Sequence, residues 1–219
     1  MIRLRFLILG LLGCFGAVSI AGAAVVPLSD LLQDGATITS GDKIFSNFNY
    51  GITGDMPTAD AVNIETIQDE FGNYGIRIQA GFTDVAGGSS SDAIVEFDVS
   101  IAPGSPLITD VHLRANPAVI NGEGLASITE TFLPTIDSDK LVVWDFGNGE
   151  DQLADSLVFD RGYETLSVQK DIILHATGDN AAVTLSFVDQ TFSIVPEPAS
   201  GALALVGFMS LAAMRRKFA

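Results

Sequence analysis

Polar and apolar residues alternate along most of this chain, with the period of two that is typical of strands with one buried face. Residues 110–116 follow the pattern without a break: aspartate, valine, histidine, leucine, arginine, alanine, asparagine. Only residues 27–32 offer a short helical turn. We expect strands at 110–116 and in similar runs rich in Val, Ile, Phe and Thr, at 43–50, 62–68, 74–82, 92–101, 140–146, 157–160, 165–177 and 181–194.

Turn-forming residues separate these runs. Gly, Pro, Asn and Ser gather at 87–91, 103–106, 121–124 and 147–149, and such clusters favour tight connections. Roughly nine to eleven strands at this spacing predict an all-β fold, an antiparallel two-sheet β-sandwich of the jelly-roll-like kind. No internal repeat or long linker divides residues 24–194, so we expect one domain with a single core.

The first 23 residues have the pattern of a secretory signal peptide. Two arginines precede an apolar run at 6–20, and the small residues Ala21 and Ala23 form a cleavage box. We therefore expect cleavage directly after this box and export through the secretory translocon. The competing interpretation is a lipoprotein signal in which Cys14 is lipidated.

The last 25 residues combine three features in order. A short motif precedes an uncharged apolar run at 199–214, which would rise about 24 Å as a helix and is short for a hydrocarbon core of about 30 Å. The basic cluster that follows would stay on the cytoplasmic side of a membrane. Prolines keep the motif extended, a suitable shape for recognition by a processing enzyme. The motif is Val195, Pro196, Glu197 and Pro198, and the basic cluster is Arg215, Arg216 and Lys217.

This three-part tail resembles the PEP-CTERM sorting signal of bacterial proteins, which membrane enzymes of the exosortase class process. Residues 28–50 and 168–194 also look like the opening and closing stretches of many proteins that carry this signal. The resemblance implies an exosortase-type partner and a transient inner-membrane anchor at 195–219. It further implies residence at the cell surface or in an exopolysaccharide matrix, and it does not imply an enzymatic activity. The alternative is an ordinary C-terminal membrane anchor.

The exported body is strongly acidic. Residues 24–195 carry six basic and 26 acidic side chains, a formal net charge of −20. Nucleic acids and anionic membranes bind clustered Lys and Arg, so this charge argues against both as partners. The only cysteine lies in the signal, which leaves the body without disulfides or thiol chemistry. The charge fits a soluble exported protein, or one that takes up divalent cations.

Candidate catalytic chemistry is sparse. His112 and His175 fall on the polar sides of their predicted strands, as solvated residues do. The chain has no nucleophile-elbow, zinc-protease or phosphate-loop motif. A glycosidase needs two carboxylates that face each other across a cleft, and no pair stands out. We therefore expect no enzymatic activity.

One acidic, glycine-containing turn is the best candidate for a metal site. Asp145, Asn148, Glu150, Asp151 and Asp155 would supply hard oxygen ligands of the kind that calcium prefers. The competing interpretation, which we favour, is a plain hairpin turn in which Asn-Gly adopts positive φ angles. We accordingly expect no required cofactor.

Aromatic residues offer a second kind of site. Phe45, Phe48 and Tyr50 are candidates for a platform that stacks sugars, but alternation puts Phe48 and Tyr50 on one face of the strand and Phe45 on the other. We expect these rings to be buried mainly in the core. We expect the same of Trp144, which follows Val142 and Val143.

Two functions from different classes fit these observations. The first, which we favour, is a non-enzymatic structural or adhesive component of the cell envelope or the exopolysaccharide matrix. The second is a carbohydrate-binding module, or a weak glycan-active enzyme, built on the same sandwich.

Overall fold

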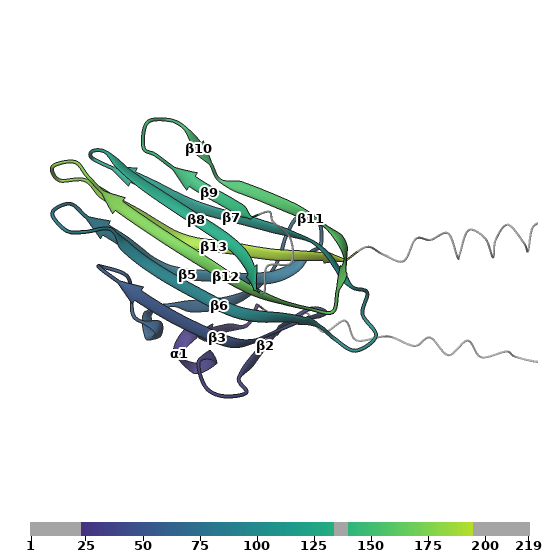
Figure 1. Cartoon of the computed structure of the whole chain (residues 1–219). Coiled ribbons are helices and arrows are strands. Elements are labelled where there is room, and N and C mark those ends of the chain that lie inside the picture. The colour runs from purple at the N-terminus through teal and green to yellow at the C-terminus, as the bar shows by residue number, and fades with distance from the viewer. Residues whose placement is uncertain (1–22, 134–139, 195–219) are drawn as a thin grey trace, which may run out of the picture.

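The computed structural model describes residues 23–133 and 140–194, which form two antiparallel β-sheets that pack face to face (Figure 1). The predicted β-sandwich is therefore confirmed. The described residues hold no helix with the length and apolarity that crossing a bilayer requires. Residues 1–22, which hold Cys14, Ala21 and the apolar run of the predicted signal peptide, and the C-terminal tail at 195–219 lie outside the described residues.

Each sheet has a simple order of neighbouring strands. Sheet A contains β1 (Val25–Pro27), β4 (Asn63–Gln68), β5 (Tyr74–Val85), β13 (Ala182–Ile194), β7 (Ile108–Ile120) and β11 (Ala154–Tyr163), in that order. Sheet B contains β10 (Asp151–Gln152), β9 (Leu141–Asp145), β8 (Gly124–Leu133), β12 (Thr165–Ala176), β6 (Ser91–Ile101), β3 (Lys43–Thr53) and β2 (Thr37–Ser40). Two short helical elements, α1 (Leu28–Leu31) and η1 (Ala59–Ala61), complete the described part.

The chain crosses repeatedly between the sheets. Among the described strands it changes sheet from β1 to β2, β3 to β4, β5 to β6, β6 to β7, β7 to β8, β10 to β11, β11 to β12 and β12 to β13. As a result β13 lies between β5 and β7 in sheet A, while β12 lies between β6 and β8 in sheet B. Residues that are distant in sequence therefore meet at the centre of each sheet.

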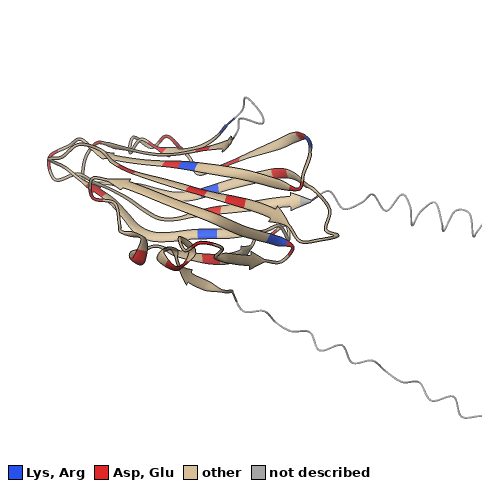
Figure 2. Ribbon diagram, turned by 60° about the horizontal axis from the view of Figure 1, so that its bottom comes forward, with Lys and Arg blue, Asp and Glu red and all other residues tan. Residues whose placement is uncertain are grey.

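Alternation builds the core as predicted. In β7, Val111, Leu113 and Ala115 are buried between the sheets, while His112 and Arg114 face outward. The inward side chains of the two sheets meet in one continuous cluster. Acidic residues lie along strands and turns around this core, with few basic residues among them (Figure 2).

The alternation predicted for β3 was wrong. A bulge between Ser46 and Asn49 interrupts its pairing with β6, and Asn47 adopts a φ of 54°. Because a bulge shifts the side-chain register, Phe45 and Phe48 both point inward. Their rings lie 5.8 and 5.6 Å from that of Phe97. The expectation that these rings serve the core is confirmed for both phenylalanines.

Trp144 was wrongly placed in the core. Val143 is the inward residue of β9, so Trp144 lies half-buried on the outer face of sheet B. Its ring stacks on that of Phe146, with centroids 4.3 Å apart. An aromatic residue that follows two valines can occupy either face of a strand, and here the register selects the outer one.

Candidate functional site

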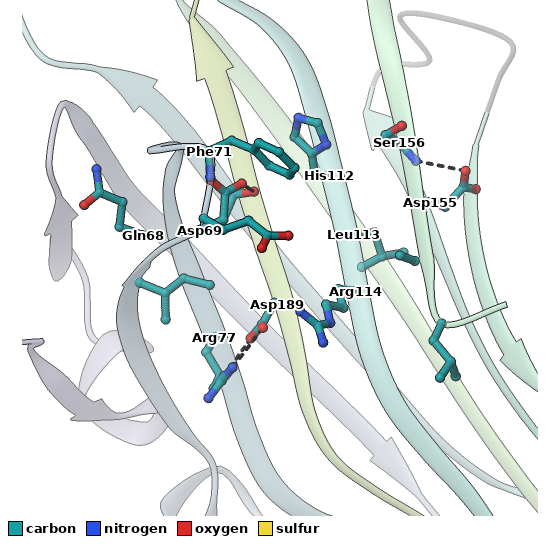
Figure 3. Close-up of a pocket in the computed structure, with 15 residues that line it drawn as sticks. Gln68, Asp69, Phe71, Arg77, His112, Leu113, Arg114, Asp155, Ser156 and Asp189 are labelled. Atoms are coloured by element: carbon teal, nitrogen blue, oxygen red, sulfur yellow. Dashed lines mark hydrogen bonds and ion pairs between the residues drawn. The ribbon is translucent and has the colours of Figure 1, made fainter.

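An open groove of about 940 Å³ lies on the outer face of sheet A, a volume typical of ligand sites. Strands β5, β13, β7 and β11 form its floor, and the turn at 69–73 between β4 and β5 forms a wall (Figure 3). The lining residues are Ile67, Gln68, Asp69, Glu70, Phe71, Arg77, His112, Leu113, Arg114, Leu153, Ala154, Asp155, Ser156, Asp189 and Thr191.

Strand register arranges the polar floor in rows. Asp189 of β13 is paired with Arg77 of β5 on one side and with Arg114 of β7 on the other. The next row pairs Thr191 of β13 with His112 of β7. Directly paired residues project to the same face of a sheet, so donors and acceptors from three strands converge on one surface.

The two arginines of the first row are in different states. Arg77 donates from Nε and Nη2 to the two oxygens of Asp189, over 2.6 and 2.9 Å. These hydrogen bonds raise the pKa of Arg77, although its partial burial acts to lower that pKa. Arg114 is exposed and has no ion-pair partner among the residues that the structure describes. One guanidinium is thus held in place, and the other is available to a ligand.

Asp69 fastens the wall of the groove to its floor. Its Oδ1 accepts hydrogen bonds of 2.9 Å from the backbone amides of Phe71 and Asn73. Its Oδ2 accepts hydrogen bonds of 2.9 Å from the Thr191 hydroxyl and from the side-chain amide of Asn73. Burial acts to raise the pKa of Asp69, but these hydrogen bonds outweigh it and hold that pKa below its ordinary value. The carboxylate therefore stays ionised, and the turn is anchored at both ends.

The anchored turn presents an aromatic ring. Phe71 is 78% exposed, the highest exposure of any large apolar residue in the described segments. In Figure 3 its ring projects toward His112, which lines the same groove. His112 lies 3.5 Å from Asp110, measured from Nε2 to Oδ1. The outward positions predicted for His112 and Asp110 are confirmed.

The candidate calcium residues form a hairpin turn. Asp145 accepts a bond from the Gly147 amide (2.7 Å), and the side-chain oxygen of Asn148 accepts one from the Glu150 amide (2.9 Å). Asp151 is the first residue of β10. Asp155 lies in β11, outside this turn, and accepts a hydrogen bond from the backbone amide of Val142. No group of three or more acidic, His or Cys side chains in the described part is placed to hold a metal. Calcium binding here stays a prediction.

A pair of carboxylates lies on the outer face of sheet B. Asp171 of β12 is paired with Ile94, and Asp92 is paired with Ile173, so the two aspartates are diagonal neighbours. Each has one buried oxygen, Oδ1, without a hydrogen-bond partner among the described residues. Partial burial, and then the contact with Asp92, raise the pKa of Asp171.

Asp171→Asn should stabilise the protein at neutral pH. A carboxyl whose pKa is raised by folding favours the folded state at low pH and loses that contribution as the pH rises through its folded pKa. The variant should melt about 1–2 °C higher at pH 7, a small gain because solvent screens this half-buried pair, and the gain should vanish near pH 4. Thermal melts at both pH values test this, with exposed Asp179→Asn as the control. A gain that grows on acidification would contradict the assignment.

Sequence reasoning did not find the groove. Its floor depends on pairs such as Arg77 and Asp189, which are 112 positions apart. One signal was present: Phe71 stands in a short polar turn between two predicted strands, where an apolar side chain has little core to join. The predicted sorting residues, Val195 to Pro198 and Arg215 to Lys217, lie outside the described residues, as does the predicted cleavage residue Ala21. The other cleavage residue, Ala23, is the first described residue and is exposed.

No family model matches the chain, and no curated protein matches it. Among solved structures, it is similar to TmCBM61 in complex with β-1,4-galactotriose, with 8% identity over 66% of this chain and 88% of the other, and a TM-score of 0.33. The xylan-binding module CBM15 follows at 14% identity, 79% and 99% coverage, and 0.30. The mannan-recognising module TmCBM27 has 11% identity, 79% and 100% coverage, and 0.28. With such low identities and TM-scores, these similarities do not bear on function.

Proposed function

We propose that this protein is an exported glycan-binding β-sandwich that takes a polysaccharide segment into the groove on sheet A. The observation that carries the proposal is an exposed ring, Phe71, fixed beside a floor of planar polar side chains. A sugar ring has an apolar face of C–H groups, which suits an aromatic surface, and a rim of hydroxyl groups that both donate and accept. The guanidinium of Arg114, the carboxylate of Asp189 and the imidazole of His112 match that rim.

Binding without cleavage is the favoured form of this function. A glycosidase needs one carboxyl that carries a proton and a second that faces it. Hydrogen bonds keep Asp69 ionised, and Asp189 has both oxygens engaged by Arg77. Asp155, a third carboxylate of the lining, accepts from the Val142 and Ser156 backbone amides. These three carboxylates act as hydrogen-bond acceptors and are not arranged to donate a proton. In this proposal the protein acts as an adhesive or structural component of the matrix or envelope by holding polysaccharide.

Phe71→Ala should weaken glycan binding about tenfold, the equivalent of about 1.4 kcal/mol. A glycan array with the purified protein would identify a ligand, and titration calorimetry would then compare the variants. Phe146→Ala is the matched control, because Phe146 is a ring 42% exposed on a turn outside the groove. Equal affinity of Phe71→Ala and the unmodified protein would overturn the site, and the absence of any glycan ligand would overturn the function.

We propose in addition that the tail directs sorting through an exosortase-type enzyme, on the strength of its three ordered features. Glu197→Ala should leave the protein uncleaved in the membrane fraction. Asp179→Ala, which removes one negative charge from an exposed turn of the sandwich, should be released normally. Immunoblots of membrane and released fractions would measure both. Normal release of Glu197→Ala would mean that the tail is only an anchor.

A further inference from the structure

Three polar side chains meet in the core where the two sheets pack together. Lys170 of β12 and Glu130 of β8 are directly paired in sheet B, and Gln190 of β13 approaches them from sheet A. All three are fully buried, with exposed fractions of 0%. Burial of a lysine and a glutamate is costly unless they interact closely.

The contacts within this cluster are direct. The Lys170 ammonium nitrogen, Nζ, lies 2.5 Å from Oε2 of Glu130 and also contacts the side-chain oxygen of Gln190. The amide nitrogen of Gln190 donates to the backbone carbonyl of His112 over 3.1 Å, which fixes the orientation of the amide. The second oxygen of Glu130 is buried and has no hydrogen-bond partner among the described residues.

The surroundings favour the uncharged forms of both ionisable groups. Each of the three residues stands between two inward apolar residues of its own strand. Burial lowers the pKa of Lys170 and raises the pKa of Glu130, against the mutual attraction of the pair. A proton shared between them can therefore pass to Glu130, which leaves Lys170 as a neutral amine, the nucleophilic form. The flanking residues are Val168, Ile172, Ile128, Phe132, Val188 and Phe192.

We propose that Lys170 and Gln190 react with each other to form an isopeptide bond that joins the two sheets, with Glu130 carrying the proton. Nζ of Lys170 attacks the side-chain carbonyl carbon of Gln190, Cδ, and a new C–N bond forms. The proton from Nζ passes through Glu130 to the departing amide nitrogen, the original C–N bond breaks, and ammonia leaves. An amine and a primary amide thus become a secondary amide and ammonia, without an oxidant or reductant.

Proximity makes this step reasonable. The reacting groups are held in contact by two strands of a packed core, which replaces an encounter in solution with a fixed geometry. The product also replaces a buried amine with a neutral amide, whose N–H can donate to Glu130. The link would give an exported body without cysteine a covalent connection between its sheets. The inference is independent of glycan binding.

Peptide mapping of the protein, purified after expression of the full-length sequence, tests the proposal. We expect trypsin to leave the chain uncut after Lys170. A protease specific for acidic residues cuts between Lys170 and Gln190, at Asp171, Asp179 and Asp189. After that digestion, the fragments that contain Lys170 and Gln190 should remain joined, with a combined mass lower by one ammonia than the two separate fragments.

The lost ammonia must be assigned to the joined fragments of Lys170 and Gln190, because an Asn-Gly pair such as Asn148–Gly149 can also lose ammonia by cyclising. Two separate, unmodified fragments from folded protein would overturn the proposal and leave a buried ion pair. Glu130→Gln should yield separate fragments, whereas Glu150→Gln, a change in an exposed turn, should keep them joined. A joined pair in Glu130→Gln would overturn the role of Glu130.

Discussion

Replacing Glu130 with leucine should lower the free energy of unfolding by about 3–5 kcal/mol at neutral pH. The leucine removes the carboxylate that lies 2.5 Å from Lys170 and leaves the lysine in an apolar core with only the Gln190 oxygen as a partner. Loss of one member of a buried pair costs more than the pair itself contributes, since the remaining amine stays desolvated and loses its carboxyl partner. Urea denaturation followed by Trp144 fluorescence measures the change.

Two comparisons separate this effect from the loss of any carboxylate. Glu96→Leu removes a carboxylate from the outer face of sheet B, where Glu96 accepts a solvent-exposed hydrogen bond from the Asn49 side chain. It should change stability by less than about 1 kcal/mol. Adding Lys170→Met and Gln190→Leu to Glu130→Leu should recover most of the loss, because an apolar replacement of a buried ion pair is often neutral. A triple variant as unstable as the single one would show that packing, not charge, sets the cost. Peptide mapping of each variant shows whether a cross-link contributes.

The strands that alternation predicted were largely correct, and β8 was missed for a physical reason. The inward positions of β8 are Ala126, Ile128, Glu130 and Phe132. A glutamate in the middle of this set breaks the apolar pattern that identifies a buried face. The position becomes intelligible only when β8 pairs with β12 and places Lys170 beside it. That pairing joins residues 40 positions apart, which no local pattern encodes.

The groove could not be predicted from the local sequence pattern for the same reason. Alternation correctly placed His112 and Arg114 on an outward face, but it does not say which strands lie beside β7. Asp189 reaches Arg77 and Arg114 because β13, the last strand, inserts between β5 and β7. A sequence therefore predicts which face of a regularly alternating strand is polar, whereas the site arises from the order in which those faces are assembled.

Gly75→Ala should cost about 3 kcal/mol of stability or more and should weaken glycan binding as well. A Cβ at residue 75 would lie 1.8 Å from the backbone oxygen of Gln190 and 2.7 Å from Cα of Thr191. These are backbone atoms of β13, so the clash can be relieved only by moving one strand away from the other. Thr191 holds Asp69, and through it the turn that carries Phe71, so the displacement would reach the wall of the groove.

Gly81→Ala is the matched control for this prediction, because Gly81 lies on the same strand and nothing stands within 4 Å of its added Cβ. It should leave stability within about 1 kcal/mol of the unmodified protein, or raise it slightly by restricting the unfolded chain. Thermal or urea denaturation, with calorimetric titration of the glycan ligand, measures both variants. Equal effects at the two glycines would contradict the close approach of β5 and β13. A stable Gly75→Ala with full affinity would show that the groove does not depend on it.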